Sequence, residues 1–210
     1  MFQPTNRLQV HELECVRDDR VLFSGLEVSI ESGEMLMLEG RNGSGKTSLL
    51  RILCGIRLPD AGYVSWCGRD IQRLGADYHE SLSYVGHKDG IKQDLTPQEN
   101  LRMSRALGTP HGGHTVDECL ERFGLYGFED VPTRTLSAGQ QRRVALSRLL
   151  VTEAPLWILD EPFTSLDRHG IEVFESLMVD HLDLGGMIVL TTHHRVGVES
   201  NRIQRFNLSS

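Results

Sequence analysis

The sequence predicts an α/β fold with a parallel sheet at its centre and a helical insertion. Three short apolar runs, EMLMLE, LWIL and MIVLT, begin at residues 34, 156 and 187 and have the length of buried strands. Helical patterns lie between them, and strands that alternate with helices are typical of parallel sheets. Residues from about 94 to 149 look mostly helical, so we expect a core from about 1–93 and 150–210 and a helical part between them.

The elements of the first half follow from local patterns. Leu22–Ile30, LFSGLEVSI, carries alternating apolar side chains, which indicates a half-buried strand. The run at 34–39 ends at a glycine, and a helical pattern follows from Lys46 to about Leu53. The turn signal PDAG at 59–62 precedes YVSW at 63–66, so we expect another strand there.

The second half begins with two helix starts. Pro97 suits the first turn of a helix that continues through ENLRMSRAL. Thr115 is a plausible N-cap for the segment TVDECLERF. The apolar runs at 156–159 and 187–191 then predict two further strands of the sheet.

Composition excludes several classes of protein. A chain of 210 residues with 39% hydrophobic and 24% charged residues suits a single globular domain. The net charge of -7 argues against a general nucleic-acid binder, which would carry a basic patch. The four cysteines show neither zinc-site spacing nor the C-x-x-C-H of covalent haem attachment, so we expect reduced thiols. No apolar run approaches the roughly 18 residues that span a bilayer, so we expect a partner to do any spanning.

The segment GRNGSGKT is expected to bind phosphate. It fits the pattern G-x-x-x-x-G-K-[ST] and lies between a predicted strand and a predicted helix. Its glycines let backbone N–H groups point at phosphate oxygens, Lys46 adds a charge for the β- and γ-phosphates, and Thr47 offers a hydroxyl to Mg²⁺. The predicted nucleotide ligands are Gly40, Arg41, Asn42, Gly43, Ser44, Gly45, Lys46 and Thr47.

Two carboxylates end the run LWILDEP. A strand that stops at a carboxylate brings it to the carboxyl edge of the sheet, where ligand sites of α/β proteins lie. We expect Asp160 to hold Mg²⁺ through water and Glu161 to polarise an attacking water. His193 follows the strand in MIVLTTHH and could contact the γ-phosphate, or it could be a solvated histidine.

The stretch LSAGQQRR at 136–143 has the features of a helix N-terminus. Free N–H groups and a partial positive charge at such an end attract anions. The alternative is an ordinary capped helix start whose Leu146, Leu149 and Leu150 face the core. Both interpretations can hold, because they use different faces of the helix.

Five motifs in order, GRNGSGKT, LSAGQ, LWILDEP, SLD at 165–167 and TTH at 191–193, resemble the ATPase subunits of ATP-binding cassette (ABC) transporters. The resemblance extends from about Leu8 to the C-terminus. It implies a P-loop fold of the ABC ATPase type, with a parallel-sheet core, an antiparallel β subdomain and a helical subdomain that carries LSAGQ. It also implies an enzyme that hydrolyses MgATP to ADP and phosphate.

In that family the LSAGQ-type segment binds the γ-phosphate held by a second copy, so the resemblance implies a head-to-tail dimer around two ATP molecules. Ser137, Gly139 and Gln140 would contact the partner's nucleotide, and Asp167 would lie along the same junction. Ala138 stands where a second glycine is commoner. Alanine lacks only the conformational freedom of glycine, so we expect function to survive.

Two positions depart from the family pattern. Arg17, in ECVRDDR, stands near the place of an aromatic residue that stacks on adenine; a guanidinium can also stack on a ring, or Arg17 is a solvated turn residue. His87, in YVGHKDG, replaces a glutamine that contacts Mg²⁺ or the attacking water. Unlike an amide, imidazole titrates near neutrality. A loop histidine with an ordinary structural partner is the alternative.

Longer stretches, among them FEDVPTRTLSAGQQRRVALSRL, resemble one branch, the ATP-binding subunits of the cytochrome c biogenesis or haem exporter system. The resemblance implies a CcmB-like membrane subunit, with CcmC and other maturation proteins, and a peripheral site on the cytoplasmic face of the bacterial inner membrane. ATP hydrolysis would drive haem export or the release of a haem-loaded chaperone. The segment Ile91–Glu99 would pass motion to the membrane subunit.

Other functions remain open at this stage. The chain could serve another small ABC exporter, or it could be a soluble ABC ATPase outside transport, which a single cassette with a modest insertion disfavours. His111 and His114, in PHGGH, could suggest a haem or metal site. We expect loop histidines instead, because the glycines between them impose no fixed geometry.

Overall fold

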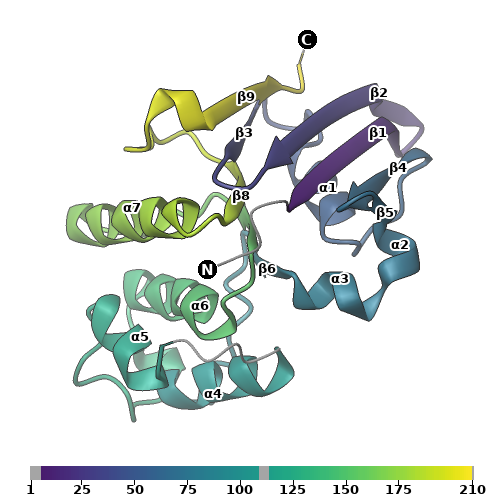
Figure 1. Ribbon diagram of the computed structural model, residues 1–210. Coiled ribbons are helices and arrows are strands. Elements are labelled where there is room, and N and C mark those ends of the chain that lie inside the picture. Colours follow the sequence, from purple (N-terminus) through teal and green to yellow (C-terminus); the bar gives the residue numbers. More distant parts are fainter. Residues whose placement is uncertain (1–5, 109–113, 210) are drawn as a thin grey trace.

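A computed structural model of the chain describes residues 6–108 and 114–209 (Figure 1). The central sheet has the strand order β6-β7-β8-β3-β9, and every neighbouring pair is parallel. This confirms the predicted parallel sheet and the strands at 34–39, 156–159 and 187–191. The strands are β3 (Met35–Glu39), β6 (Leu82–Val85), β7 (Leu156–Asp160), β8 (Met187–Thr191) and β9 (Ile203–Asn207).

A second, antiparallel sheet has the order β2-β1-β4-β5. Its strands are β1 (Arg7–Arg17), β2 (Arg20–Glu31), β4 (Ala61–Trp66) and β5 (Arg69–Asp70). The predicted strands at 22–30 and 63–66 are confirmed inside β2 and β4. The latter begins two residues early, because Ala61 of the turn signal already pairs with Glu14 of β1.

Strand β1 was not predicted from the sequence, because a bulge interrupts its alternation. Glu12 has a φ of 45°, and the alternation changes phase there: Leu8 and Val10 are buried before it, and Leu13 and Cys15 after it. Gly62 of β4 lies against this bulge, and a Cβ there would come within 2.3 Å of the carbonyl oxygen of His11. Glycine is therefore required where the two backbones approach.

The predicted helices at 46–53, 97–107 and 115–123 are confirmed as α1, α4 and α5. Thr96 and Thr115 each cap their helix in a reciprocal capping box with a glutamate three residues on. In Figure 1, α4, α5 and α6 gather at one end of the molecule, away from the antiparallel sheet. The α-helices are α1 (Lys46–Leu53), α2 (Ile71–Leu74), α3 (Ala76–Glu80), α4 (Pro97–Leu107), α5 (Val116–Arg122), α6 (Ala138–Thr152) and α7 (Arg168–Asp183), and the 3₁₀ turns are η1 (Thr133–Thr135) and η2 (Ser200–Arg202).

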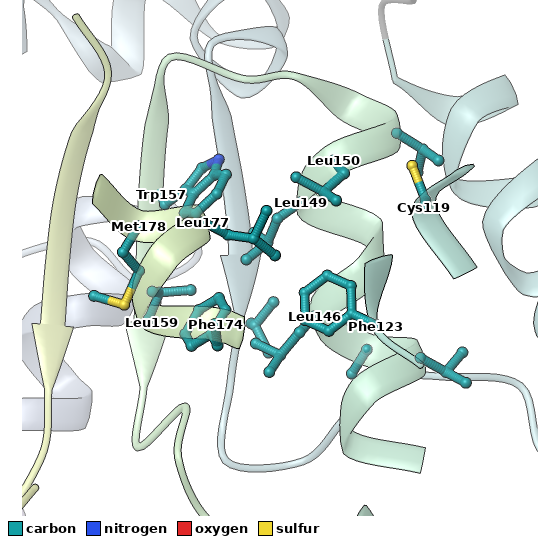
Figure 2. Packing of buried hydrophobic residues seen from close by; sticks show 14 of the residues in the cluster. Cys119, Phe123, Leu146, Leu149, Leu150, Trp157, Leu159, Phe174, Leu177 and Met178 are labelled. Atoms are coloured by element: carbon teal, nitrogen blue, oxygen red, sulfur yellow. The ribbon is translucent and has the colours of Figure 1, made fainter. Parts of the chain in front are cut away.

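The parallel sheet is buried on both faces. Alternate residues of β7 belong to two apolar clusters: Trp157 and Leu159 join the cluster of α6 and α7, and Ile158 joins that of α1 and the antiparallel sheet. Figure 2 shows the first cluster, where side chains of α6 and α7 meet those of β7. Burial on both faces explains why the strands are continuous apolar runs without alternation.

Helix α6 packs as expected, because Leu146, Leu149 and Leu150 are all buried in this first cluster (Figure 2).

Among the described residues, no helix combines the length and the apolar character that a membrane crossing requires.

Candidate functional site

The phosphate loop joins β3 to α1, as the motif requires. Lys46, the first residue of α1, donates hydrogen bonds from Nζ to the carbonyl oxygens of Gly40 at 2.7 Å and Arg41 at 3.2 Å. Gly45 precedes the helix with a φ of 101°, in the left-handed region that favours glycine. The buried Ser44 hydroxyl has no hydrogen-bond partner within the described chain. A donor of this kind in a phosphate loop suits an oxygen of a bound phosphate.

Asp160 ends β7 and lies beside the loop. One carboxylate oxygen accepts a hydrogen bond from the Thr47 hydroxyl at 2.9 Å, and the other accepts from the Thr191 hydroxyl at 2.7 Å. The Asp160 side chain is only 4% exposed, so these hydroxyls replace the water that a carboxylate otherwise binds. The sequence identified Thr191 only as part of the TTH motif and gave no sign that it orients Asp160.

Glu161 follows Asp160 at the carboxyl edge of the sheet. Its backbone N–H donates to the carbonyl oxygen of Thr191 at 3.1 Å, and its φ of 50° lies in the left-handed region. This backbone turn sends the chain away from the strand directly after Asp160. The two carboxylates therefore stand at the end of β7, as predicted.

A cavity of about 380 Å³ brings together residues that are far apart in the sequence. The phosphate loop forms one wall and the end of β7 another. Arg17 comes from the end of β1 and His87 from the segment after β6. The cavity is lined by Arg17, Lys46, Thr47, His87, Asp160 and Glu161, among others.

His193 lies next to this cavity. Its Nε2 is 3.7 Å from a carboxylate oxygen of Glu161, and its side chain is 74% exposed. It lines an adjoining hollow of about 330 Å³, which shares Lys46 with the first. His193 is therefore close to the carboxylate and the phosphate loop, although its side chain is more exposed than that of Glu161, which is 27% exposed.

The segment LSAGQQRR at 136–143, which we call the signature segment, forms a capped helix start. The Ser137 hydroxyl accepts a hydrogen bond from the Gln140 N–H at 3.3 Å, and the Gln140 side chain accepts from the Ser137 N–H at 2.9 Å. Ser137 and Ala138 are exposed at the tip of α6. The described residues that line the phosphate-loop cavity do not include Ser137, Gly139 or Gln140.

Gly139 has a role within the chain that the sequence did not reveal. A Cβ at this position would lie 2.8 Å from the carbonyl oxygen of Ser165, in the loop between β7 and α7. Glycine thus lets that loop pack on the first turn of α6. Next to it, Arg143 pairs with Asp167, which caps α7 by accepting from the Gly170 N–H at 2.8 Å. The Gly170 N–H and the Arg143 side chain lower the pKa of Asp167.

The role of a second arginine of α6, Arg142, was not predicted from the sequence. Arg142 is buried, and its guanidinium donates hydrogen bonds to the loops after β6 and β7. The letters RR in LSAGQQRR are the only sequence signal, and they do not tell which arginine faces inward.

Of the two histidines in PHGGH, only His114 lies among the described residues. His111 lies outside the described residues. Among residues 6–108 and 114–209, no three or more histidine, cysteine, aspartate or glutamate side chains are grouped closely enough to hold a metal ion.

Comparisons with known proteins agree with this geometry. The ABC transporter family model matches residues 23–164. The cytochrome c biogenesis ATP-binding export protein CcmA of Methylococcus capsulatus is 51% identical, over 94% of this chain and 95% of that protein. The protein of the same name from Nitrosomonas europaea is 47% identical, over 98% and 97%.

A solved structure of an ATP-binding subunit of an ABC transporter has the same fold. It superposes with a TM-score of 0.80 at 25% identity, over 89% of this chain and 79% of that chain. The chain belongs to the ABC transporter family, and within that family it groups with the cytochrome c biogenesis ATP-binding export proteins.

Proposed function

We propose that this chain is the ATP-hydrolysing subunit of a membrane complex for cytochrome c biogenesis. The observation that carries the ATPase assignment is the cavity in which Lys46 and Thr47 face Asp160 and Glu161. The assignment to cytochrome c biogenesis is supported by the names of relatives that are 47% and 51% identical over nearly the full chain.

ATP would bind with its phosphates in the loop Gly40–Thr47. Lys46 would exchange its bonds to the carbonyls of Gly40 and Arg41 for bonds to phosphate oxygens, and the unpartnered Ser44 hydroxyl would gain an acceptor. Arg17, which lines the same cavity, would stack on the adenine ring.

The oxygen atoms of Thr47 and Asp160 suit Mg²⁺. They are 2.9 Å apart, and hydroxyl and carboxylate oxygens are the donors that this ion prefers. At nucleotide sites one or two protein oxygens suffice, because phosphates and water complete the shell. His87 lines the same cavity and would be a further contact of the ion. When bound, Mg²⁺ neutralises charge on the β- and γ-phosphate oxygens.

Glu161 would accept a hydrogen bond from the attacking water and so orient it towards the γ-phosphorus. The new bond joins the water oxygen to phosphorus, and the bond to the bridging oxygen of ADP breaks. His193, 3.7 Å from Glu161, would contact the γ-phosphate, and His87 would contact the water from the opposite loop. Catalysis of this kind depends on positioning and charge stabilisation.

A second copy would complete each site. The Ser137 hydroxyl oxygen already accepts a bond within its own helix, which leaves its proton free to donate to the partner's γ-phosphate. The N-terminus of the 15-residue helix α6, with Gly139 and Gln140 in its first turn, supports the same contact through its dipole. Asp167 would lie along this junction.

The remaining assignments concern the surroundings of the ATPase. Residues of about 1–93 and 150–210 would form the catalytic core with its β subdomain, and about 94–149 would form the helical subdomain. The chain would contact a CcmB-like membrane subunit through the segment 91–99. CcmC and other maturation proteins would lie nearby, at the cytoplasmic face of the inner membrane. Hydrolysis would drive haem export or release of a haem-loaded chaperone.

The test is affinity purification from native membranes, followed by assay of phosphate release. We expect a CcmB-like protein to be recovered, and we expect the recovered complex to hydrolyse ATP faster than the isolated chain. Lys46→Ala is the control for adventitious ATPase and should remove the activity. Recovery of a different permease would assign the chain to another exporter, and recovery without any membrane protein would favour an ABC ATPase outside transport.

A further inference from the structure

Arg142 joins three parts of the molecule through one buried guanidinium. Its side chain is 3% exposed and lies in the second turn of α6. All three nitrogens donate hydrogen bonds. Nε donates to Pro162 O at 3.1 Å, Nη1 to Gly86 O at 3.0 Å and Asp89 Oδ1 at 2.9 Å, and Nη2 to Asp160 O at 3.3 Å and Glu161 O at 2.8 Å.

These acceptors belong to two segments whose side chains His87, Asp160 and Glu161 line the same cavity as the phosphate loop. Gly86 and Asp89 flank His87 in the first loop. The carbonyls of Asp160 and Glu161 belong to the backbone that carries both carboxylates. Arg142 therefore restrains the residues next to His87 and Glu161 without lining the cavity itself.

Helix α6, which carries Arg142, begins at the signature segment, and its exposed N-terminal residues form the tip discussed here. Ser137 caps α6, and Arg142 follows five residues later on a continuous helix. A displacement of the tip is transmitted along such a helix to the guanidinium, because its backbone hydrogen bonds keep it rigid over this distance. The tip and the two loops are thus connected through Arg142 and one turn of continuous helix.

We infer that Arg142 is a positioning residue. It sets Glu161 and the His87 loop for hydrolysis according to where the tip of its own helix sits on the partner's nucleotide. The inference rests on the proposed ATPase function and on the two-copy site. Through Arg142, closure at one nucleotide would align the catalytic carboxylate at the other.

Arginine suits this position and lysine does not. The guanidinium has five N–H donors in a fixed plane, and here they reach five oxygens on two loops. An ammonium has three donors at one point and cannot span both loops. The carboxylate of Asp89 compensates the buried charge at 2.9 Å, and a lysine would keep that charge while losing the span.

Arg148 provides a matched control on the same helix. Among the described residues it donates hydrogen bonds to Tyr84, Asp89 and Gly90, all at the end of β6 or in the loop that follows it. It is half-buried, and burial lowers the pKa of its guanidinium. Arg148 thus holds the loop that carries His87, as Arg142 does, but its bonds do not extend to the backbone of Asp160 and Glu161.

The experiment compares Arg142→Lys with Arg148→Lys in the complete membrane complex. The quantities are kcat for ATP and the Kd of a fluorescent ATP analogue. We expect Arg142→Lys to lower kcat about tenfold or more, because small misplacements of catalytic groups have effects of up to about 100-fold. The Kd should stay within about twofold, since the phosphate loop is untouched. Arg148→Lys should lower kcat much less.

The outcomes separate a positioning role from a structural one. If Arg142→Lys has the kcat of the wild type, or if both variants lose kcat and affinity together, the inference is wrong. If Arg142→Lys does not fold, Asp89→Asn is tested in its place, because this variant keeps an oxygen acceptor for Arg142 and removes the charge. Asp89→Asn should lower kcat and leave the Kd unchanged. An unchanged kcat in this variant would overturn the inference. A wild-type complex that hydrolyses no ATP would overturn the proposed function itself.

Discussion

Thr47 donates a hydrogen bond to one carboxylate oxygen of Asp160, 2.9 Å away, across 113 positions of sequence. Thr191 holds the other oxygen at 2.7 Å. The first turn of α1 and the ends of β7 and β8 thus meet at a single buried carboxylate. This arrangement orients the oxygen atoms that would hold Mg²⁺.

Substitution of Thr47 tests this role. Thr47→Val keeps the shape of the side chain and removes the hydroxyl, so the Mg²⁺ concentration for half-maximal ATPase should rise. Loss of an outer-shell partner already costs about 10- to 100-fold in metal affinity or activity, and loss of a direct ligand should cost at least that. Thr47→Ser keeps the hydroxyl and should stay near the wild type. Equal Mg²⁺ dependence in both variants would contradict the assignment.

Glu161→Gln should separate binding from hydrolysis. The amide keeps the size of the side chain but orients water poorly, so phosphate release should fall by a factor of about 10² to 10⁴. ATP binding should be retained, and the complex should accumulate with two ATP-bound copies joined. Light scattering at saturating MgATP, with the membrane subunits present, measures that state. A variant that stays unpaired under these conditions would remove the support for the two-copy site.

Gly139→Ala should destabilise the chain although alanine favours helices. The added methyl would lie 2.8 Å from the carbonyl oxygen of Ser165, so the loop or the helix must shift. Overpacking of this kind costs about 1–3 kcal/mol of unfolding free energy. Ala138→Gly, one residue earlier and exposed, should cost less than about 1 kcal/mol. Urea unfolding of both variants compares them, and a Gly139→Ala variant as stable as the wild type would refute the close contact.

The buried imidazole of His181 should make the free energy of unfolding depend on pH. It is buried in α7, stacked on Trp157 with ring centroids 3.9 Å apart, and burial lowers its pKa from 6.5 to about 4. Above pH 6.5 the imidazole is neutral in both states, and its contribution is fully present. As the pH falls from about 6.5 to about 4, the unfolded chain takes up a proton first, so stability falls; below about 4 both states are protonated and the loss ends.

The measurement is the unfolding free energy in urea at pH 7.5 and pH 5. His181→Phe keeps a ring against Trp157 and removes the titration. Between the two pH values the wild type should lose about 2 kcal/mol more than this variant, at about 1.4 kcal/mol for each pH unit between 6.5 and 5. Parallel losses in the two proteins would show that His181 is charged in the folded state.

The amino-acid sequence by itself determined the features that depend on local spacing. The loop GRNGSGKT, the carboxylates at the end of LWILDEP and the capped start at LSAGQ are each defined by neighbouring residues. Their strands and helices could be predicted because apolar period and cap chemistry act over one or two turns of chain. Strands β3, β7 and β8 of the parallel sheet follow from the same short-range signals, whereas β6 and β9 were not predicted.

Only the tertiary structure decided which side chains support these motifs. Arg142, Thr191 and Gly139 act on residues 18 or more positions away, and the bulge at Glu12 hides β1 from any test of alternation. Hydrogen bonds and close approaches of this kind require the directions of two backbones to be known together. A sequence pattern contains neither direction, so such partners appear only when the chain is folded.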